Sequence, residues 1–359
     1  MNSLRYTLLD RALTSSLLPE RALRAGAHGA AAARQRREER GGVEAQEVRL
    51  TSLVTRMSSG PIAEAPAKAN EQHYELPAEF FSVFLGPRRK YSSGFWAEGV
   101  ADIAAAEEAM LDLTCQRAGI QDGMDVLDLG CGWGALSIWL TEHYDVHVLA
   151  VSNSRRQGEW IKAERDNRHL TNRLDIVTSD VNNFDPGRRF DRVISVEMFE
   201  HMRNWAALLA RIADWLENDG KAFIHMFSHR RLAYRFVDTW AAERFFTGGT
   251  MPSHELLLRF ADDLVVTQRW AVSGMHYAKT LAAWLERLNA NADQALAILR
   301  AERPERDARQ LLATWRLFLI ATTEIWAWRE GDEWMISHYL LERRGRRGRK
   351  ALVRATYSA

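Results

Sequence analysis

Apolar and polar positions follow two alternating periods between residues 100 and 230 of the chain. Short apolar runs of strand length are separated by longer segments in which apolar residues recur at helical spacing. Because parallel strands that alternate with helices are joined by right-handed crossovers, this pattern predicts an α/β fold with a doubly wound, mostly parallel sheet. The expected strands are MDVLDLG (124–130), VHVLAVS (146–152), LDIVTSD (174–180), FDRVISVEM (190–198) and KAFIHMFSH (221–229).

The regions on either side of this pattern differ from it in composition. Residues 1–60 are helical and polar in pattern, and the run AAAARQRREER (30–40) predicts an exposed helix. We expect this extension to pack against the catalytic domain. The segment 230–330 predicts a helical insertion on the substrate side, and EWMISHYLLERR (333–344) predicts a strand that returns to the sheet. The expected boundaries are a helical extension at 1–60, a linker at 61–70, a catalytic domain at 71–344 and a basic tail at 345–359.

Composition narrows the functional classes. The net charge of +1 gives no general case for binding nucleic acid. Only two cysteines, Cys115 and Cys131, are present, which excludes a disulfide framework and a cysteine-rich zinc site. No apolar run is long enough to span a bilayer and the N-terminus lacks a signal-peptide pattern, so we expect a cytoplasmic protein without a metal. The basic run RRGRRGRK (343–350) predicts a solvated tail, with transient contact to acidic lipid headgroups as the alternative.

Tryptophan is abundant, with thirteen residues in the chain. Core packing accounts for such residues in most proteins. The alternative is an aromatic wall around a bulky apolar or cationic substrate. The sequence does not position these side chains, so both interpretations remain.

The strongest local signal is VLDLGCGWG (126–134), where a strand ends in Asp128 and Gly130, Gly132 and Gly134 open a helix. Glycines permit a tight turn and a close approach of backbone to a ligand, and the first βα turn of a doubly wound sheet is a natural crevice. A dinucleotide loop would place its third glycine one position later, and an ordinary glycine turn is the other alternative. The D-x-G-x-G-x-G pattern resembles the S-adenosylmethionine loop of class I methyltransferases, in which an acid can bind the ammonium of the cofactor.

Further candidate residues, most of them polar, follow the next two strands. Asn153 and Gln157 come after the second strand, and Asp180 and Val181 come after the third. Each alone also fits a helix cap or a turn. Because the carboxyl ends of parallel strands meet at one edge of the sheet, together they predict a cofactor site. Class I methyltransferases usually carry an acid after the second strand that binds the ribose hydroxyls. It is absent here, so the side-chain amides of Asn153 and Gln157 are expected to replace it, and Asp180 is expected near the adenine.

Six segments resemble the family of cyclopropane fatty acid synthases and coclaurine-type N-methyltransferases. The resemblance covers residues 70–344 and implies a class I methyltransferase fold, Rossmann-like, with S-adenosylmethionine as cofactor. In that family the KYS segment folds over the cofactor, which implies contacts from Tyr91 and Ser92, while Gly130, Asn153 and Gln157, like Asp180, match family cofactor positions. The segments are EQHYELPAEFFSVFLGPRRKYSSGFW (71–96), VLDLGCGWGALSIWL (126–140), VISVEMFEHMRNW (193–205), YRFVDTWAAERFFTGGTMPS (234–253), GMHYAKTLAAWLERL (274–288) and GDEWMISHYLLERR (331–344).

The cyclopropane branch of this family adds a methyl group to a cis double bond of a lipid chain. It then removes a proton with a bicarbonate held by a cysteine, a glutamate, a histidine and a tyrosine. The resemblance implies that Glu200, His225 and Tyr277 match three of these residues. Ser93 stands where the cysteine is expected, and Thr322 stands near the position of a second cysteine. These departures put a bicarbonate site in doubt.

The N-methyltransferase branch carries the E-M-F-E-H motif, which is retained here as Glu197, Glu200 and His201. Glu324, in place of a small residue, and the run FFTGGTMPS (245–253) also resemble this branch, whereas His225 and Tyr277 occur in both branches. We therefore expect Ser93 and Glu324 on the substrate side of the site. These features favour an amine substrate over a lipid olefin.

The spacing of the motif supports acid–base chemistry. At i, i+3 and i+4, the side chains of Glu197, Glu200 and His201 would share one face of a helical turn. A carboxylate can hold an ammonium and a neutral histidine can accept a proton, which exposes the lone pair that attacks a methyl group. Helix capping by the same residues is the alternative. The sequence thus predicts an amine methyltransferase, with cyclopropane synthesis on phospholipid acyl chains second and carboxylate methylation third. It predicts no oligomeric state.

Overall fold

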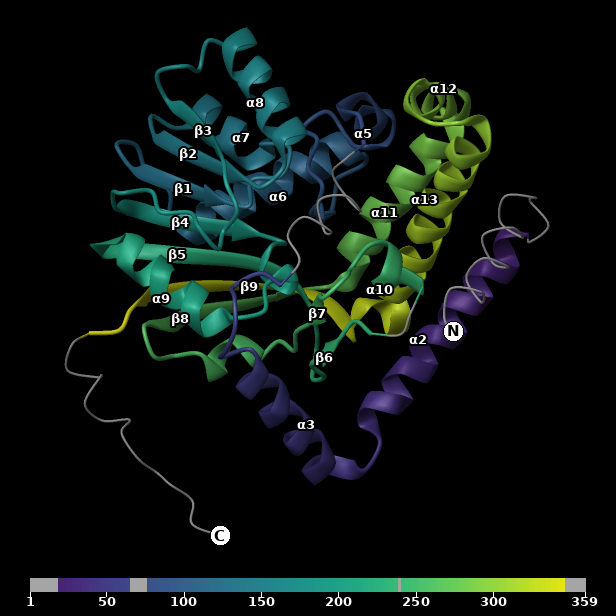
Figure 1. Ribbon diagram of the computed structural model, residues 1–359, viewed down its shortest axis with the longest axis horizontal. Coiled ribbons are helices and arrows are strands. Elements are labelled where there is room, and N and C mark those ends of the chain that lie inside the picture. The colour runs from purple at the N-terminus through teal and green to yellow at the C-terminus, as the bar shows by residue number, and fades with distance from the viewer. Residues whose placement is uncertain (1–18, 65–75, 238–239, 346–359) are drawn as a thin grey trace.

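Residues 19–64, 76–237 and 240–345 are described by the computed structural model shown in Figure 1. A seven-stranded sheet with strand order β3-β2-β1-β4-β5-β9-β8 forms its centre. The pairs from β3 to β5 are parallel, and β9 runs antiparallel to both β5 and β8. This confirms the predicted α/β fold. The strands of the sheet are β1 (Asp125–Leu129), β2 (His147–Ser152), β3 (Leu174–Thr178), β4 (Phe190–Val196), β5 (Leu216–His229), β8 (Leu264–Val272) and β9 (Trp334–Arg343).

Helices cover both faces of the sheet, which explains why its inner strands are apolar at consecutive positions. Val126 packs into the core beneath α6, α7 and α8, whereas the next residue, Leu127, packs into the core beneath α9. Val193 and Ile194 of β4 divide in the same way, because successive side chains of a strand point to opposite faces. These helices are α6 (Ile103–Ala118), α7 (Ala135–His143), α8 (Arg155–Asn167) and α9 (Trp205–Trp215).

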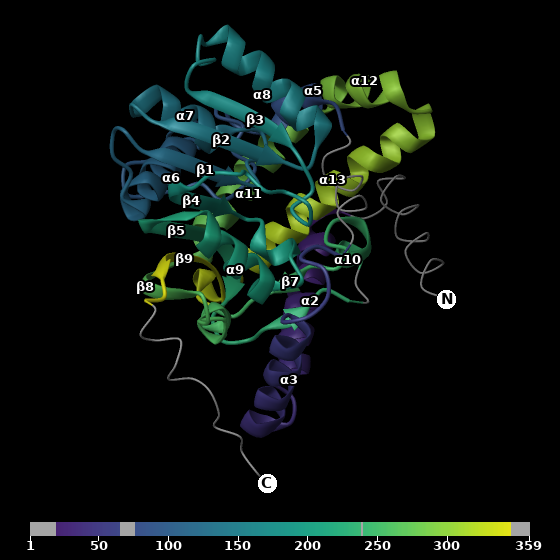
Figure 2. The same cartoon turned by 60° about the vertical axis from the view of Figure 1, so that its left-hand side comes forward.

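The helical insertion lies against the end of the sheet where the parallel strands finish (Figures 1 and 2). Its helices α11, α12 and α13 pack with α5 around a core rich in aromatic side chains. Among the described residues, none of the helices has both the length and the apolar character needed to span a membrane. The remaining elements are α5 (Ala78–Phe84), η1 (Phe199–His201), β6 (Tyr234–Arg235), α10 (Trp240–Arg244), β7 (Thr250–Met251), η2 (Leu256–Arg259), α11 (Gly274–Ala290), α12 (Ala292–Glu302), α13 (Glu305–Trp326) and η3 (Trp328–Gly331).

Among its described residues, the predicted helical insertion at 230–330 also contains three strands, the short pair β6 and β7 and the longer β8. Residues 264–272 form strand β8, which pairs with β9 and lies at the edge of the sheet. Its polar middle, Thr267 to Arg269, faces solvent, so the apolar run typical of a buried strand is missing. Pairing with β9 supplies the hydrogen bonds that its composition alone does not predict.

The described part of the N-terminal extension forms two helices, α2 (Glu20–Glu39) and α3 (Gly42–Arg56). Helix α2 lies alongside α13 in both views (Figures 1 and 2). The expectation that 30–40 is an exposed helix is wrong in part, because Ala31 and Gln35 are buried. The guanidinium of Arg34 lies 5.2 Å from the ring centre of Tyr234. The expected domain start near Asn70 and the basic tail from 346 onward lie outside the described residues.

Candidate active site

The glycine loop turns between β1 and α7. The amides of Gly130 and Cys131 donate to the carbonyl of Val151 at 2.9 and 3.0 Å, which ties the loop to the end of β2. Gly130 has φ +85°, and a Cβ built there would lie 2.9 Å from Sδ of Met198. A side chain would therefore be both strained and obstructed, so bare backbone faces the adjoining space. Gly134 instead precedes the first residue of α7, where a Cβ would lie 2.9 Å from Cγ1 of Ile161.

Asp128 lies beneath this loop at the end of β1. Its side chain is buried, and its Oδ2 accepts a hydrogen bond of 2.6 Å from Oγ of Ser137. Burial raises the pKa of Asp128 to about 6, and hydrogen bonds from Ser137 oppose that rise. A cationic group beside Asp128 would favour the ionised carboxylate. The cavity that Asp128 lines also contains Lys90, Tyr91, Ser92, Gly130, Gly132 and Trp133.

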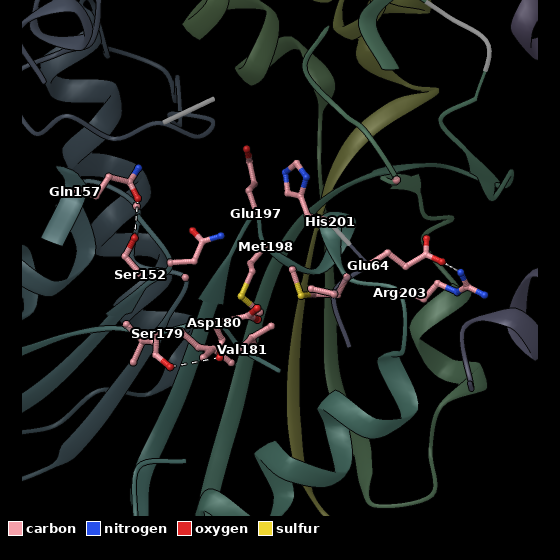
Figure 3. A pocket seen from close by; sticks show the side chains of 18 of the residues that line it. Glu64, Ser152, Gln157, Ser179, Asp180, Val181, Glu197, Met198, His201 and Arg203 are labelled. Atoms are coloured by element: carbon pink, nitrogen blue, oxygen red, sulfur yellow. Dashed lines mark hydrogen bonds and ion pairs between the residues drawn. The ribbon is translucent and has the colours of Figure 1, made fainter. Parts of the chain in front are cut away.

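A second cavity adjoins the first around the glycine loop (Figure 3). Gly130, Gly132 and Glu197 line both cavities. The structure brings the predicted residues at successive strand ends together here, although Asp180 Oδ1 also accepts a bond of 2.8 Å from the amide of Asn182 and so shapes a turn. The residues predicted to bind cofactor that line this cavity are Asn153, Gln157, Asp180 and Val181.

Two buried donors on these cavities have no hydrogen-bond acceptor among the described residues. They are Nε2 of Gln157 and Nε1 of Trp133. Oε1 of Gln157 accepts a bond of 2.8 Å from Ser152 Oγ, which leaves the amide nitrogen for a ligand. An unsatisfied buried donor costs ~1–3 kcal/mol, so a ligand that carries oxygen acceptors would be stabilised here. A buried acid, a bare glycine loop and free donors together fit S-adenosylmethionine.

Glu197 is the first residue after β4 and has φ +49°, a left-handed conformation that is rare for glutamate. Its Oε2 accepts a hydrogen bond of 2.6 Å from Oη of Tyr277. Its Oε1 lies 3.2 Å from the amide of Ser93 and 3.3 Å from Nε2 of His225. Burial raises the pKa of Glu197, and the charge of Lys90 opposes that rise. Such strain persists only where the surroundings over-determine it, as they do here.

The three residues of the E-M-F-E-H motif do not share one helical face, because Glu197 precedes the short helix η1 in a left-handed conformation. His201 lines the second cavity beside Glu197 (Figure 3). Burial lowers the pKa of His201 to about 4, so its imidazole is neutral at pH 7. Glu200 is fully buried behind them, and its Oε1 accepts a bond of 2.5 Å from the amide of Phe227. Burial raises the pKa of Glu200 well above its ordinary value, and the nearby Glu197 adds to the rise.

A third, small cavity lies between Glu197 and the insertion, and we call it the aromatic chamber. Glu197 and His201 are its polar members. The faces of Tyr277 and Trp326 stack at 4.9 Å behind it, so tryptophan here contributes both to the core and to the wall. The other residues that line the chamber are Tyr91, Phe227, Phe246, Tyr277, Leu281, Trp284 and Phe318.

Comparison with known proteins agrees with this geometry. The family model described as "Mycolic acid cyclopropane synthetase" matches residues 63–328. The chain belongs to this family. It is 34% identical to (S)-coclaurine N-methyltransferase of Thalictrum flavum subsp. glaucum over 310 residues, which are 84% of this chain and 86% of that enzyme. It is 31% identical to the cyclopropane-fatty-acyl-phospholipid synthase of Escherichia coli strain K12 over 219 residues, 60% of this chain and 55% of the synthase.

A solved structure of coclaurine N-methyltransferase bound to N-methylheliamine and SAH superposes with a TM-score of 0.90. It is 32% identical, and the match covers 94% of this chain and 99% of the other. These likenesses and the cavities around the glycine loop identify the protein as a class I, S-adenosylmethionine-dependent methyltransferase.

Within this mycolic acid cyclopropane synthetase family member, two residues expected on the substrate side lie elsewhere. Oγ of Ser93 donates to the carbonyl of Gly94 at 2.9 Å, and only the amide of Ser93 reaches Glu197. Glu324 forms an ion pair with Arg24 at 2.5 Å and lies 3.0 Å from Nε2 of His28, so it holds α2 against α13. Neither side chain lines the aromatic chamber as the described residues form it.

Lys90 is a functional candidate that the sequence reasoning missed. Its buried ammonium donates to Oγ of Ser92 at 2.5 Å and to the carbonyl of Ser93 at 2.7 Å. Burial lowers the pKa of Lys90 to about 8, although Glu197 and Glu107 raise it. Through its two hydrogen bonds Lys90 holds the KYS segment in place, and its ammonium contributes positive charge near Glu197. Its place in the KYS segment, directly before Tyr91 and Ser92, was the feature of the sequence that could have indicated this role.

Proposed function

We propose that this methyltransferase transfers the methyl group to the nitrogen of a small aromatic amine. The carrying observation is a single carboxylate, Glu197, with a neutral imidazole, His201, at the edge of a chamber whose other walls are apolar and mainly aromatic. A protonated amine is attracted both to a buried carboxylate and to the faces of aromatic rings. The relatedness to (S)-coclaurine N-methyltransferase supports the same substrate class.

Glu197 is the residue that we expect to manage the proton. An amine has a pKa near ~10, so it arrives protonated and must lose a proton before its lone pair can attack. The raised pKa of Glu197 makes its carboxylate a better base than a solvated one, whereas His201, with its pKa lowered to about 4, acts as a hydrogen-bond acceptor. The proton moves from the ammonium to Glu197 and later to solvent. S-adenosylmethionine supplies an electrophilic methyl group, and the chamber walls orient the nitrogen toward it.

We expect Asp128, Gln157 and the turn at Asp180 to hold the cofactor. Asp128 faces the cavity of the KYS segment and suits the ammonium of the amino-acid part. The unpaired Nε2 of Gln157 suits a ribose oxygen. Tyr91 and Ser92 close the same space from the other side, as the KYS resemblance implies. The buried, unbridged thiols of Cys115 and Cys131 support a reducing, cytoplasmic location.

The cyclopropane alternative is less well supported. It needs a glutamate, a histidine, a tyrosine and a cysteine around one bicarbonate. Here the Oγ of Ser93 turns to the carbonyl of Gly94, and Glu200 is bonded to the amide of Phe227. The direct contacts of Tyr277 and His225 with Glu197 occupy the remaining members of the set. We therefore expect amine methylation rather than lipid modification.

The test uses purified protein with methyl-labelled S-adenosylmethionine and three acceptors: coclaurine, an aliphatic secondary amine, and vesicles of cis-unsaturated phosphatidylethanolamine. We expect label in coclaurine and none in the lipid. Glu197→Gln should abolish the transfer while SAH binding persists, and the exposed Glu159→Gln should match the wild type. Label in the lipid fraction alone would overturn the proposal.

A further inference from the structure

Four side chains form a line of hydrogen bonds that runs from α6 across β9 and β5 and ends at Glu197, directly after β4. NH1 of Arg117, on α6, lies 2.7 Å from Nδ1 of His338 on β9. Nε2 of His338 lies 2.9 Å from Nδ1 of His225, its directly paired neighbour on β5. Nε2 of His225 lies 3.3 Å from Oε1 of Glu197. The polar line is continuous from Arg117, between α6 and the sheet, to the aromatic chamber.

The chemistry of the first member sets the direction of the whole line. A guanidinium has donors only, so Nδ1 of His338 accepts and its proton resides on Nε2. That N–H donates to Nδ1 of His225, which leaves the proton of His225 on Nε2, where it donates to Glu197. A neutral imidazole can carry its proton on either nitrogen, and the partner of one nitrogen decides the state of the other. Arg117 therefore determines whether Nε2 of His225, the atom that faces Glu197, carries a proton.

Both histidines are expected to be neutral, so the two rings orient N–H groups and carry no net charge. His225 and His338 are fully buried. Burial lowers the pKa of each well below its ordinary value, and the positive charges of Lys90 and Arg117 add to that effect. Arg117 itself lies over the ring of Trp270 at 5.0 Å, which holds the guanidinium in place. The titratable and charged groups that face Glu197 and the two histidines are Lys90 from the KYS segment, Arg117 from α6, Glu200 and His201 from η1, and Tyr277 from α11.

We propose that Arg117 and His338 are positioning residues that hold His225 in the tautomer whose N–H donates to Glu197. Neither residue lines the cofactor cavities or the aromatic chamber as the described residues form them. Their effect is to keep the carboxylate of Glu197 ionised and fixed toward the chamber. Without them His225 can present a lone pair to Glu197, which favours a protonated glutamic acid that cannot take a proton from the amine. The inference rests on the role of Glu197 in the proposed function.

The kinetic test compares the pH dependence of kcat/KM in the wild type and in four variants. His338→Leu and Arg117→Met each remove a residue that keeps the Nε2 proton of His225 directed at Glu197. Either change should move the acidic limb of the kcat/KM profile to higher pH by about one unit, because a hydrogen bond to a charged group is worth enough to shift a pKa by that amount. His338→Gln should restore the wild-type limb, since its amide donates from the place of Nε2 and its oxygen accepts from Arg117. His229→Leu removes another fully buried histidine of β5 and should leave the limb unchanged.

A readout without turnover separates this inference from the proposed function. In protein with ¹⁵N-labelled histidine, the two ring nitrogens of His225 report the tautomer by NMR in the absence of substrate. We expect the Nε2–H form of His225 in the wild type and in His338→Gln, and a mixture of tautomers in Arg117→Met. Because Arg117→Met leaves the buried His225 and His338 in place, it serves as the test if His338→Leu fails to fold. An unchanged acidic limb and an unchanged tautomer in Arg117→Met would overturn the proposal. Wild-type protein that shows the Nε2–H form but methylates no amine would overturn the proposed function instead.

Discussion

The hydroxyl of Tyr277 donates a hydrogen bond of 2.6 Å to Oε2 of Glu197. This bond joins α11 of the insertion to the turn after β4, so the substrate side of the molecule and the cofactor side share one carboxylate. Tyr277 cannot accept the proton of the amine, because burial raises its pKa well above its ordinary value and Glu197 adds to the rise. We infer that it acts on Glu197 as a donor.

Tyr277→Phe should therefore shift the acidic limb of kcat/KM to higher pH. The active form needs an ionised Glu197, whose pKa is raised by burial and lowered by Lys90, Tyr277 and Ser93. Removing the Tyr277 donor raises that pKa further, so activity is lost at a higher pH as the solution is acidified. The expected shift is about one pH unit or more, with ~10-fold lower kcat/KM near the limb. Tyr234→Phe, which removes another buried hydroxyl, is the control; an equal shift there would contradict the assignment.

His201→Leu should lower kcat without moving the same limb. Burial lowers the pKa of His201 to about 4, so its protonation lies below the range in which Glu197 titrates. The loss of a positioned acceptor should reduce kcat by about 10²-fold, the lower end of the usual contribution of such a group. Stopped assays with labelled cofactor from pH 5 to pH 9 measure both quantities. Disappearance of the acidic limb in this variant would show that His201, and not Glu197, is the titrating base.

Ser137→Ala should weaken cofactor binding in a way that depends on pH. The hydroxyl of Ser137 stabilises the ionised form of Asp128, whose pKa burial raises to about 6. Without it that pKa rises further, so the ammonium of the ligand meets a neutral acid over a wider pH range. We expect about fivefold or greater loss of SAH affinity near pH 6.5 and recovery by pH 8.5, measured by calorimetry. Ser195→Ala, which removes a buried hydroxyl bonded to the carbonyl of Leu129, should keep the wild-type pH dependence.

Glu324→Gln tests whether this residue serves the N-terminal helix or the substrate. Its contacts with Arg24 and His28 are partly exposed, so we expect a loss of only ~1 kcal/mol in the free energy of unfolding. Amide hydrogen exchange should rise in α2, while the KM for the amine changes less than twofold. Glu302→Gln, which breaks an exposed pair with Arg156, should leave exchange in α2 unchanged. A raised KM with normal exchange in α2 would return Glu324 to the substrate site.

The parallel sheet and the cofactor loop could be predicted from local sequence. Strand and helix periods are properties of neighbouring residues, so the five parallel strands and the turn at Gly130 were predictable from their own composition. The edge strand β8 was not predictable in this way, because its hydrogen-bond partners lie on β9, some seventy residues later along the chain. The contact of Glu324 with Arg24 was not predictable for a similar reason, since the two residues lie 300 positions apart in sequence.

The sequence by itself determined that an acid, a glycine turn and the E-M-F-E-H motif stand at the ends of parallel strands, since strand order and crossover handedness place those ends at one edge. Only the tertiary structure decided what each motif residue does. Glu197 turns toward Tyr277 and His225 because its backbone is left-handed, and Glu200 turns away toward the amide of Phe227. Contacts between groups distant in sequence set burial, donor direction and pKa, and no local pattern encodes these.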